Sequence, residues 1–140
     1  MSYFDTSVLV AFYCPEELST KAEKAILKDS EPTLSILSIV EFASAIFRKS
    51  REKTITIEYA KSIWEQFNVH RSKNYYSIIT IDSNHYASAA SFIMQLKTPL
   101  RTLDALHLAI AAELSTQIVT ADKILEKSAE KLNIPHVLIG

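Results

Sequence analysis

Glycine is almost absent from this chain. Of 140 residues only the last, Gly140, is a glycine, whereas average usage of about 7% would give roughly ten. Glycine-rich loops that bind phosphate through backbone N–H groups need positive φ angles or close approach of the backbone to the anion. The sequence therefore excludes a P-loop and a dinucleotide-binding fingerprint. If the protein acts on a phosphate group, side chains must provide the contacts.

Cysteine, charge imbalance and long apolar runs are also lacking. Cys14 is the only cysteine, which excludes an intrachain disulfide and a zinc site built from several cysteines. A formal net charge of −1 excludes a global field that would attract nucleic acid or an anionic membrane. No apolar run is long enough for a membrane span, and the first residues lack the basic region of a signal peptide. We therefore expect a cytoplasmic protein without a membrane partner.

The order of the remaining patterns predicts the fold class. Short β-rich runs alternate with longer helical patterns, which is typical of βαβ units. We expect one domain over residues 1–140, a three-layer α/β/α sandwich with a mainly parallel central sheet. Strands are expected at 3–4, 34–36, 76–81, 118–120 and 136–139. Helices are expected from about Thr6, after Pro15, from Ser38 to the charged run 48–53, over 54–73, around 86–96, over 102–114 and over 122–133.

Four acids stand where helices are expected to begin: Asp5, Glu41, Asp104 and Asp122. Each has a structural explanation, because Asp is a common N-cap, Ser38-Ile-Val-Glu41 matches a capping box, and an acid in a first turn complements the helix dipole. Asp82 is interpreted as a cap alone. Two of the junctions, at Asp5 and Asp122, follow strands, and open parallel sheets bind ligands at that edge.

The surroundings of Asp104 favour chemistry over capping. This acid lies in Leu103-Asp-Ala-Leu-His-Leu-Ala-Ile-Ala111, where an unpaired carboxylate would be costly. Basic partners are sparse, and Arg101 is the nearest in sequence. Four converging acids would repel one another unless a divalent cation lay between them. Hard oxygen ligands of this kind suit Mg²⁺ or Mn²⁺.

Four segments together resemble a known family. They are Tyr3-Phe-Asp5-Thr-Ser7, Ile39-Val-Glu41, the Asp104 segment, and Ile118-Val-Thr120-Ala-Asp122. In this order, over the whole chain, they resemble the PIN domain, in particular the VapC-type ribonuclease toxins of prokaryotic toxin–antitoxin pairs. The glycines that family members often carry before the last two segments are missing here.

The resemblance implies a function and its residues. PIN domains are Mg²⁺- or Mn²⁺-dependent nucleases, so the resemblance implies metal-activated hydrolysis of RNA. The catalytic and metal-binding residues would be Asp5, Glu41, Asp104 and Asp122, with Ser7 and Thr120 as supporting hydroxyls. The resemblance also implies a homodimer and a small antitoxin partner.

The sequence offers few basic residues that could contact the phosphates of RNA. Arg48 follows Glu41 by seven residues and so returns to nearly the same helix face. Arg48, Lys49, Arg51 and Lys53 are candidates for phosphate contact, with Arg101 beside the Asp104 segment. His107, flanked by leucines, is interpreted as a core residue or as a residue behind the acids.

Other functions remain open or are excluded. A haloacid-dehalogenase-type phosphatase also begins with Asp after its first strand, but it needs an acid and a threonine where Ser7 and Leu9 stand. A catalytically inactive PIN-like module that binds RNA or protein remains an alternative, as does a housekeeping RNA-processing nuclease. Cleavage assays on variants with acids replaced by amides would distinguish an inactive binding module from an enzyme. A neighbouring antitoxin gene would distinguish a toxin from a housekeeping nuclease.

Overall fold

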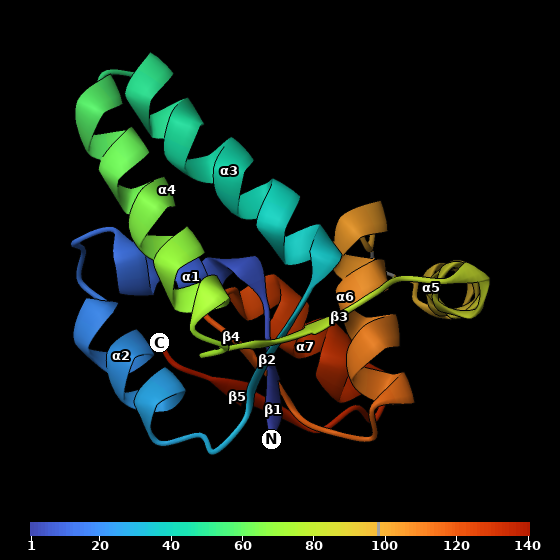
Figure 1. Cartoon of the computed structure of the whole chain (residues 1–140). Coiled ribbons are helices and arrows are strands. Elements are labelled where there is room, and N and C mark those ends of the chain that lie inside the picture. The colour runs from blue at the N-terminus through green and yellow to red at the C-terminus, as the bar shows by residue number, and fades with distance from the viewer. Residues whose placement is uncertain (98) are drawn as a thin grey trace.

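The computed structural model describes residues 1–97 and 99–140 (Figure 1). In chain order its elements are β1 (Ser2–Phe4), α1 (Thr6–Tyr13), α2 (Ser19–Leu27), β2 (Pro32–Ser35), α3 (Ile36–Arg51), α4 (Ile57–Ser72), β3 (Ser77–Ile79), α5 (Ser83–Gln95), α6 (Thr102–Glu113), β4 (Ile118–Thr120), α7 (Lys123–Lys131) and β5 (His136–Leu138). The expected alternation of strands and helices is confirmed.

The strands form one parallel sheet in the order β3-β2-β1-β4-β5. In its register Tyr3 lies beside Thr33 on one side and Ile118 on the other. β1 and β4 are neighbours, so the residues that follow them, Asp5 and Ala121-Asp122, leave the sheet at the same edge. This is the edge at which open parallel sheets bind ligands.

Two helical layers cover the sheet, because successive strand residues face opposite sides. Phe4 and Val119 belong to one buried cluster with side chains of α1, α2, α3 and α4. Tyr3 and Ile118 belong to another, with side chains of α6 and α7. The predicted three-layer α/β/α arrangement is therefore confirmed. In Figure 1, α3 and α4 lie side by side as a hairpin that extends away from the sheet.

The start of α3 differs from the prediction. The helix begins at Ile36 rather than Ser38, and its capping box joins Ser35 and Ser38 instead of Ser38 and Glu41. The reason is that two serines three residues apart can bond each other's backbone reciprocally, and Ser35 N donates to Ser38 Oγ at 3.3 Å. Glu41 consequently lies beyond the first turn and takes no part in capping. The capping explanation for this acid was wrong.

Other boundaries shift by a few residues. α4 is capped by Thr56, so residues 54–56 precede it rather than belong to it. β3 is confined to the three residues that pair with β2, shorter than the run 76–81 predicted, because it is an edge strand with one neighbour. The prediction that 102–114 form a buried helix is confirmed, since the seven residues from Ala105 to Ala111 are all buried.

Four helices end on a residue in the left-handed conformation that is not glycine. These residues are Lys53, Asn74, Ser115 and Asn133, with φ between 52° and 61°. At the end of α3, Lys53 N donates to Ser50 O and Thr54 N donates to Lys49 O. This is the Schellman motif, whose left-handed position glycine usually occupies. The shortage of glycine thus affects the ends of these helices as well as the possible phosphate-binding loops.

Within the described residues, none of the helices is long and apolar enough to cross a membrane.

Candidate active site

Asp5 is a buried carboxylate fixed by three donors. It follows β1 directly, caps α1, and is 4% exposed. Its Oδ1 accepts from Ser7 Oγ at 2.5 Å and from Val8 N at 3.4 Å, and its Oδ2 accepts from Thr120 Oγ1 at 2.7 Å. Burial raises the pKa of Asp5, and the charge of His107 and these hydrogen bonds counteract only part of that effect. The structure thus places both supporting hydroxyls named by the sequence against this acid.

Thr120 also connects Asp5 to Asp122. The backbone N–H of Asp122 donates to Thr120 Oγ1 at 2.9 Å, so one hydroxyl contacts both acids. Asp122 caps α7, and its Oδ1 accepts from Ile124 N at 2.8 Å and Leu125 N at 3.3 Å. One carboxylate oxygen is therefore used for capping, which leaves the other for a ligand. Capping and ligand binding are compatible at this position.

Glu41 is held by two donors on one oxygen. Its Oε1 accepts from Thr6 Oγ1 at 2.6 Å and lies 2.5 Å from His107 Nε2. Burial alone would raise the pKa of Glu41, but the hydrogen bond and charge of His107, together with the Thr6 hydroxyl, outweigh it and lower the pKa. The second oxygen, Oε2, carries neither of these bonds. The local structure therefore keeps Glu41 ionised and turns one oxygen away from its supports.

A buried chain of hydrogen bonds stands behind Glu41. His107 is 2% exposed, and its Nδ1 lies 2.6 Å from the hydroxyl of Tyr3, which in turn lies 2.9 Å from Ser35 Oγ. Because ionised Glu41 can only accept, Nε2 carries a ring proton, and in a neutral ring Nδ1 then accepts from Tyr3. The interpretation of His107 as a residue behind the acids agrees with this geometry, whereas the roles of Tyr3 and Thr6 were missed.

Asp104 shows that the four acids converge. It lies in the first turn of α6 and is half-buried. Burial raises its pKa, the charge of Asp122 raises it further, the charge of His107 lowers it, and the charges of Asp5 and Glu41 add smaller effects that raise it. Among the residues that the structure describes, its carboxylate has no hydrogen bond or ion pair. The charges of the other three acids therefore act on Asp104, and that of His107 opposes them.

A divalent cation fits this group by the chemistry of its donors. The available atoms are carboxylate oxygens, the ligands that hard cations prefer, and a cation would relieve the repulsion at Asp104. In residues 1–97 and 99–140, no three of the four acids bring one oxygen each within 4.8 Å of one another. Mg²⁺ keeps several waters and takes only one or two carboxylates directly. The spacing is thus compatible with a partly hydrated ion.

A groove with basic walls adjoins Asp104 and Asp122. This cavity has a volume of about 440 Å³ and is lined by Pro99, Leu100, Arg101, Asp104, Asp122, Ile124, Lys127, Ser128 and Lys131. Arg101, named from the sequence, lies in it. Lys127 and Lys131 were missed, although the two lysines are four residues apart in the helix that follows Asp122, which places them on one helix face.

The basic run on α3 lies elsewhere. Arg48, Lys49 and Arg51 occupy the last turn of α3, at the far end of the helix from Glu41, and none of them lines this groove. The positive charge of Lys49 acts instead on Cys14, whose pKa is raised by burial and partly lowered by that lysine. Cys14 itself is buried, as expected for a small apolar residue.

The sequence model of the PIN domain matches residues 2–131. The chain belongs to the PIN domain family. Among curated proteins, it is similar to Ribonuclease VapC3 of Pyrobaculum aerophilum, with 24% identity over 135 residues that cover 94% of this chain and 96% of the relative. Metal dependence is typical of PIN nucleases.

Solved structures of other proteins share the fold of this chain. A toxin–antitoxin complex from Klebsiella pneumoniae has a TM-score of 0.70 at 16% identity, over 100% of this chain and 98% of the other. VapC20 of Mycobacterium tuberculosis, described as a toxin that cleaves the sarcin–ricin loop, has a TM-score of 0.72 at 11% identity, over 91% of this chain and 95% of the other. At these identities the likeness establishes the fold.

Proposed function

We propose that this PIN domain is a metal-dependent endoribonuclease that acts as the toxin of a toxin–antitoxin pair. The observation that carries the proposal is the convergence of four acids around Asp104, beside a groove with basic walls. The similarity to a VapC ribonuclease along nearly the whole chain supports the same activity. Because its substrate is RNA, we place the activity in the cytoplasm.

Asp5, Glu41, Asp104 and Asp122 are the residues that would hold Mg²⁺ or Mn²⁺. When bound, such a cation supplies an activated water at neutral pH and neutralises charge on the phosphate. The chain's own contribution is orientation. Ser7, Thr120 and His107 each hold an acid by a short hydrogen bond, and partners of this kind fix metal-binding carboxylates in place.

The groove beside Asp104 gives the substrate a path. Arg101 and Lys127 line it together with the two acids, so phosphates on either side of the cleaved bond would meet positive charge. The basic residues at the end of α3 are a second set of contacts, farther from the acids. This arrangement favours a single-stranded or looped RNA segment, whose backbone can follow a groove.

A small antitoxin is the proposed protein partner. The similarity to a chain from a toxin–antitoxin complex supports this assignment. We also propose a homodimer, supported by apolar side chains that α5 leaves exposed, with Tyr86 58% and Met94 79% exposed. Light scattering on the wild type and on Met94→Glu tests the dimer, which the charge is expected to weaken.

Cleavage of structured RNAs with Mg²⁺ or Mn²⁺ tests the activity, comparing the wild type with Asp5→Asn and Asp104→Asn. Asp82→Asn is the matched control, since Asp82 caps α5 as Asp5 caps α1 and asparagine is itself a good cap. We expect both site variants to lose cleavage, the control to keep it, and products with 5′-phosphate and 3′-hydroxyl ends.

Two results would overturn the proposal. If both site variants cleave like the wild type, the four acids are not the catalytic site. If the wild type binds RNA but cleaves no RNA in the presence of either cation, the protein is an inactive binding module.

A further inference from the structure

One face of α7 gives the groove beside the acids an ordered chemistry. Ile124, Lys127, Ser128 and Lys131 all line this groove, and they recur at the three- and four-residue spacing of a single helix face. Asp122 caps the helix directly before them. At 1.5 Å per residue, Lys127 and Lys131 lie about 7.5 and 13.5 Å beyond Asp122 along the axis. An acid, an apolar side chain and two cations therefore follow one another along the groove.

The apolar part of the groove has two walls. Ile124 is 66% exposed, and it is not an isolated surface residue, because Pro99 and Leu100 line the same groove. Leu100 also packs against two buried clusters, one with side chains of α6 and α7 and one between α5 and α6. The wall that carries Leu100 is therefore held in place by the core.

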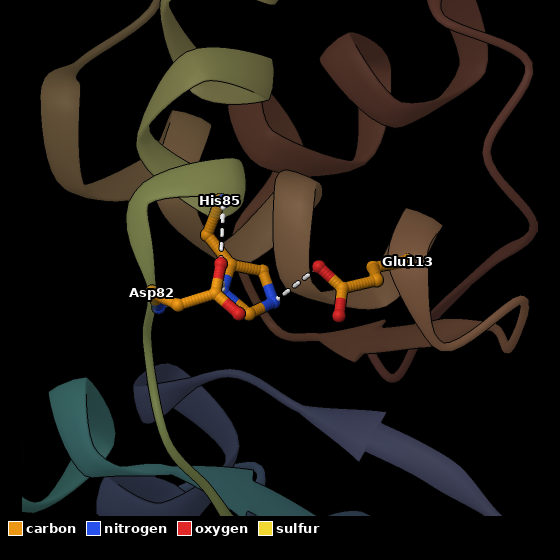
Figure 2. A group of neighbouring side chains, drawn as sticks. All are labelled: Asp82, His85 and Glu113. Carbon is orange, nitrogen blue, oxygen red and sulfur yellow. Dashed lines mark hydrogen bonds and ion pairs between the residues drawn. The ribbon is translucent and has the colours of Figure 1, made fainter.

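A polar contact also fixes the helices on either side of that wall. Pro99 and Leu100 follow α5 and precede α6. His85 Nε2 lies 2.8 Å from Glu113 Oε2, and His85 Nδ1 accepts from the backbone N–H of Asp82 at 3.0 Å. Figure 2 shows the Glu113 carboxylate of α6 beside the ring carried by α5. Because both ring nitrogens have partners, this cluster joins two helices and offers no site for a ligand.

Ser128 brings an unused hydroxyl to the groove. The residue lines the groove and is only 4% exposed. Over the described ranges 1–97 and 99–140, its hydroxyl has no hydrogen-bond partner. A serine inside a helix can bond the carbonyl four residues earlier, but Ser128 does not, so its hydroxyl is available to a ligand. A hydroxyl both donates and accepts, and it can meet either kind of atom on the edge of a base.

We propose that this groove binds one unpaired nucleobase of the RNA, next to the phosphate that is cleaved. The inference rests on the proposed ribonuclease function. The parts of a nucleotide follow the same order as the groove: a phosphate at the acids that would hold the cation, a base against Ile124 and Leu100, and the next phosphate at Lys127. The volume of about 440 Å³ falls within the range of about 300–1,000 Å³ that is usual for small-molecule sites.

The walls also indicate which base is preferred. Aliphatic side chains bind a base in proportion to the apolar area that they bury, and the Ser128 hydroxyl accepts a donor or an acceptor equally. Size rather than hydrogen-bond pattern therefore decides, which favours a purine over a pyrimidine. A paired and stacked base cannot enter the groove, so the substrate class is RNA with an unpaired purine in a loop or single strand.

The affinities of AMP and ribose 5-phosphate, measured by NMR titration in Mg²⁺, test this base subsite, because the two ligands differ by the base. We expect the wild type to bind AMP about fivefold more tightly or better, with UMP between the two. Ile124→Ser should lower the affinity for AMP to that for ribose 5-phosphate. Ser128→Ala should weaken AMP binding alone, whereas Lys127→Ala should weaken both ligands alike.

Ile57→Ser is the matched control, because Ile57 is also an exposed isoleucine in the first turn of a capped helix but lies outside the groove. It should keep the preference for AMP. Equal affinities of the wild type for the two ligands, no binding of AMP at millimolar concentration, or a preference that persists in Ile124→Ser overturns the subsite. If the affinities are equal and Ile124→Ser also shifts light scattering to a smaller particle, the apolar walls contact a second copy of the chain instead.

These titrations involve no cleavage, so they separate the two proposals. A wild type that cleaves RNA but binds AMP and ribose 5-phosphate equally lacks the base subsite and keeps the ribonuclease function. A wild type that prefers AMP but cleaves no RNA has the base subsite and lacks the ribonuclease function.

Discussion

Nε2 of His107 lies 2.5 Å from Oε1 of Glu41, although the two residues are 66 positions apart in the chain. The contact ties α6 to α3 directly beneath the proposed metal-binding acids. Since His107 is itself held by Tyr3 of β1, the position of Glu41, a proposed metal ligand, depends on three elements at once. The position of Glu41 therefore depends on buried residues as well as on residues at the surface.

Replacing His107 with leucine should reduce both stability and metal affinity. The substitution leaves the Tyr3 hydroxyl with Ser35 Oγ as its remaining partner and Glu41 with one donor fewer, at a cost of about 2–3 kcal/mol in the free energy of unfolding. We expect Mn²⁺ affinity to fall about 10–100-fold. Chemical denaturation and calorimetric titration measure the two quantities. His136→Leu is the control, expected to cost less than about 1 kcal/mol; unchanged Mn²⁺ affinity in a folded His107→Leu protein would contradict the positioning role.

Thr120→Val removes a hydroxyl that touches both Asp5 and the backbone of Asp122. We expect Mn²⁺ affinity about 10–100-fold below that of the wild type, because two acids lose the group that aligns them. Thr33→Val is the control, since Thr33 is equally buried in β2 but its hydroxyl donates to Glu31 O rather than to an acid of the site. Both variants should lose stability, and only Thr120→Val should lose metal affinity. Equal metal affinities in the two variants would argue against this alignment.

Asp104→Asn should stabilise the metal-free protein at neutral pH. Burial and the neighbouring acids raise the pKa of Asp104 in the folded state, so the folded protein holds this proton to higher pH than the unfolded chain. The wild type therefore loses stability as pH rises from the ordinary aspartate pKa of about 3.9 through the raised value. Urea denaturation in EDTA should show a gain in the variant that vanishes in acid.

Saturating Mg²⁺ should reverse the order of stability of these two proteins. A cation that binds only the folded state at 100 times its Kd adds about 2.7 kcal/mol, and Asp104→Asn should receive less of it. A wild type that Mg²⁺ does not stabilise would contradict the metal site, whatever the result in EDTA.

Lys127→Ala should weaken RNA binding if the groove beside Asp104 is the substrate path. In a cleavage-deficient Asp5→Asn background, loss of one phosphate contact should reduce the slope of log affinity against log salt by about 0.7. Arg51→Ala compares the basic end of α3, and Lys24→Ala on α2 is the control. A larger effect of Arg51→Ala than of Lys127→Ala would indicate that the RNA binds along α3 instead.

The sequence alone predicted the features that depend on residues close to one another in the chain. Asp5 and Asp122 were placed correctly because each follows a buried strand and precedes a helix, a local signal. The start of α3 was misjudged because Ser35 and Ser38 both suit an N-cap, and the choice between them depends on where β2 stops pairing. The Tyr3–His107 contact spans 104 residues. No local pattern encodes it, since it follows from the order in which strands and helices pack.

The left-handed helix ends have a consequence for engineering. Lys53 and Ser115 hold a conformation that costs a residue with a Cβ roughly 1 kcal/mol more than glycine. Ser115 belongs neither to the acidic site nor to the basic groove, whereas Lys53 is one of the basic residues proposed to contact RNA. Natural proteins seldom have the highest stability that their fold allows, and Ser115 is a position at which this chain could gain stability. Ser115→Gly would therefore give a more stable background in which destabilising substitutions at the acids can be studied without unfolding the protein.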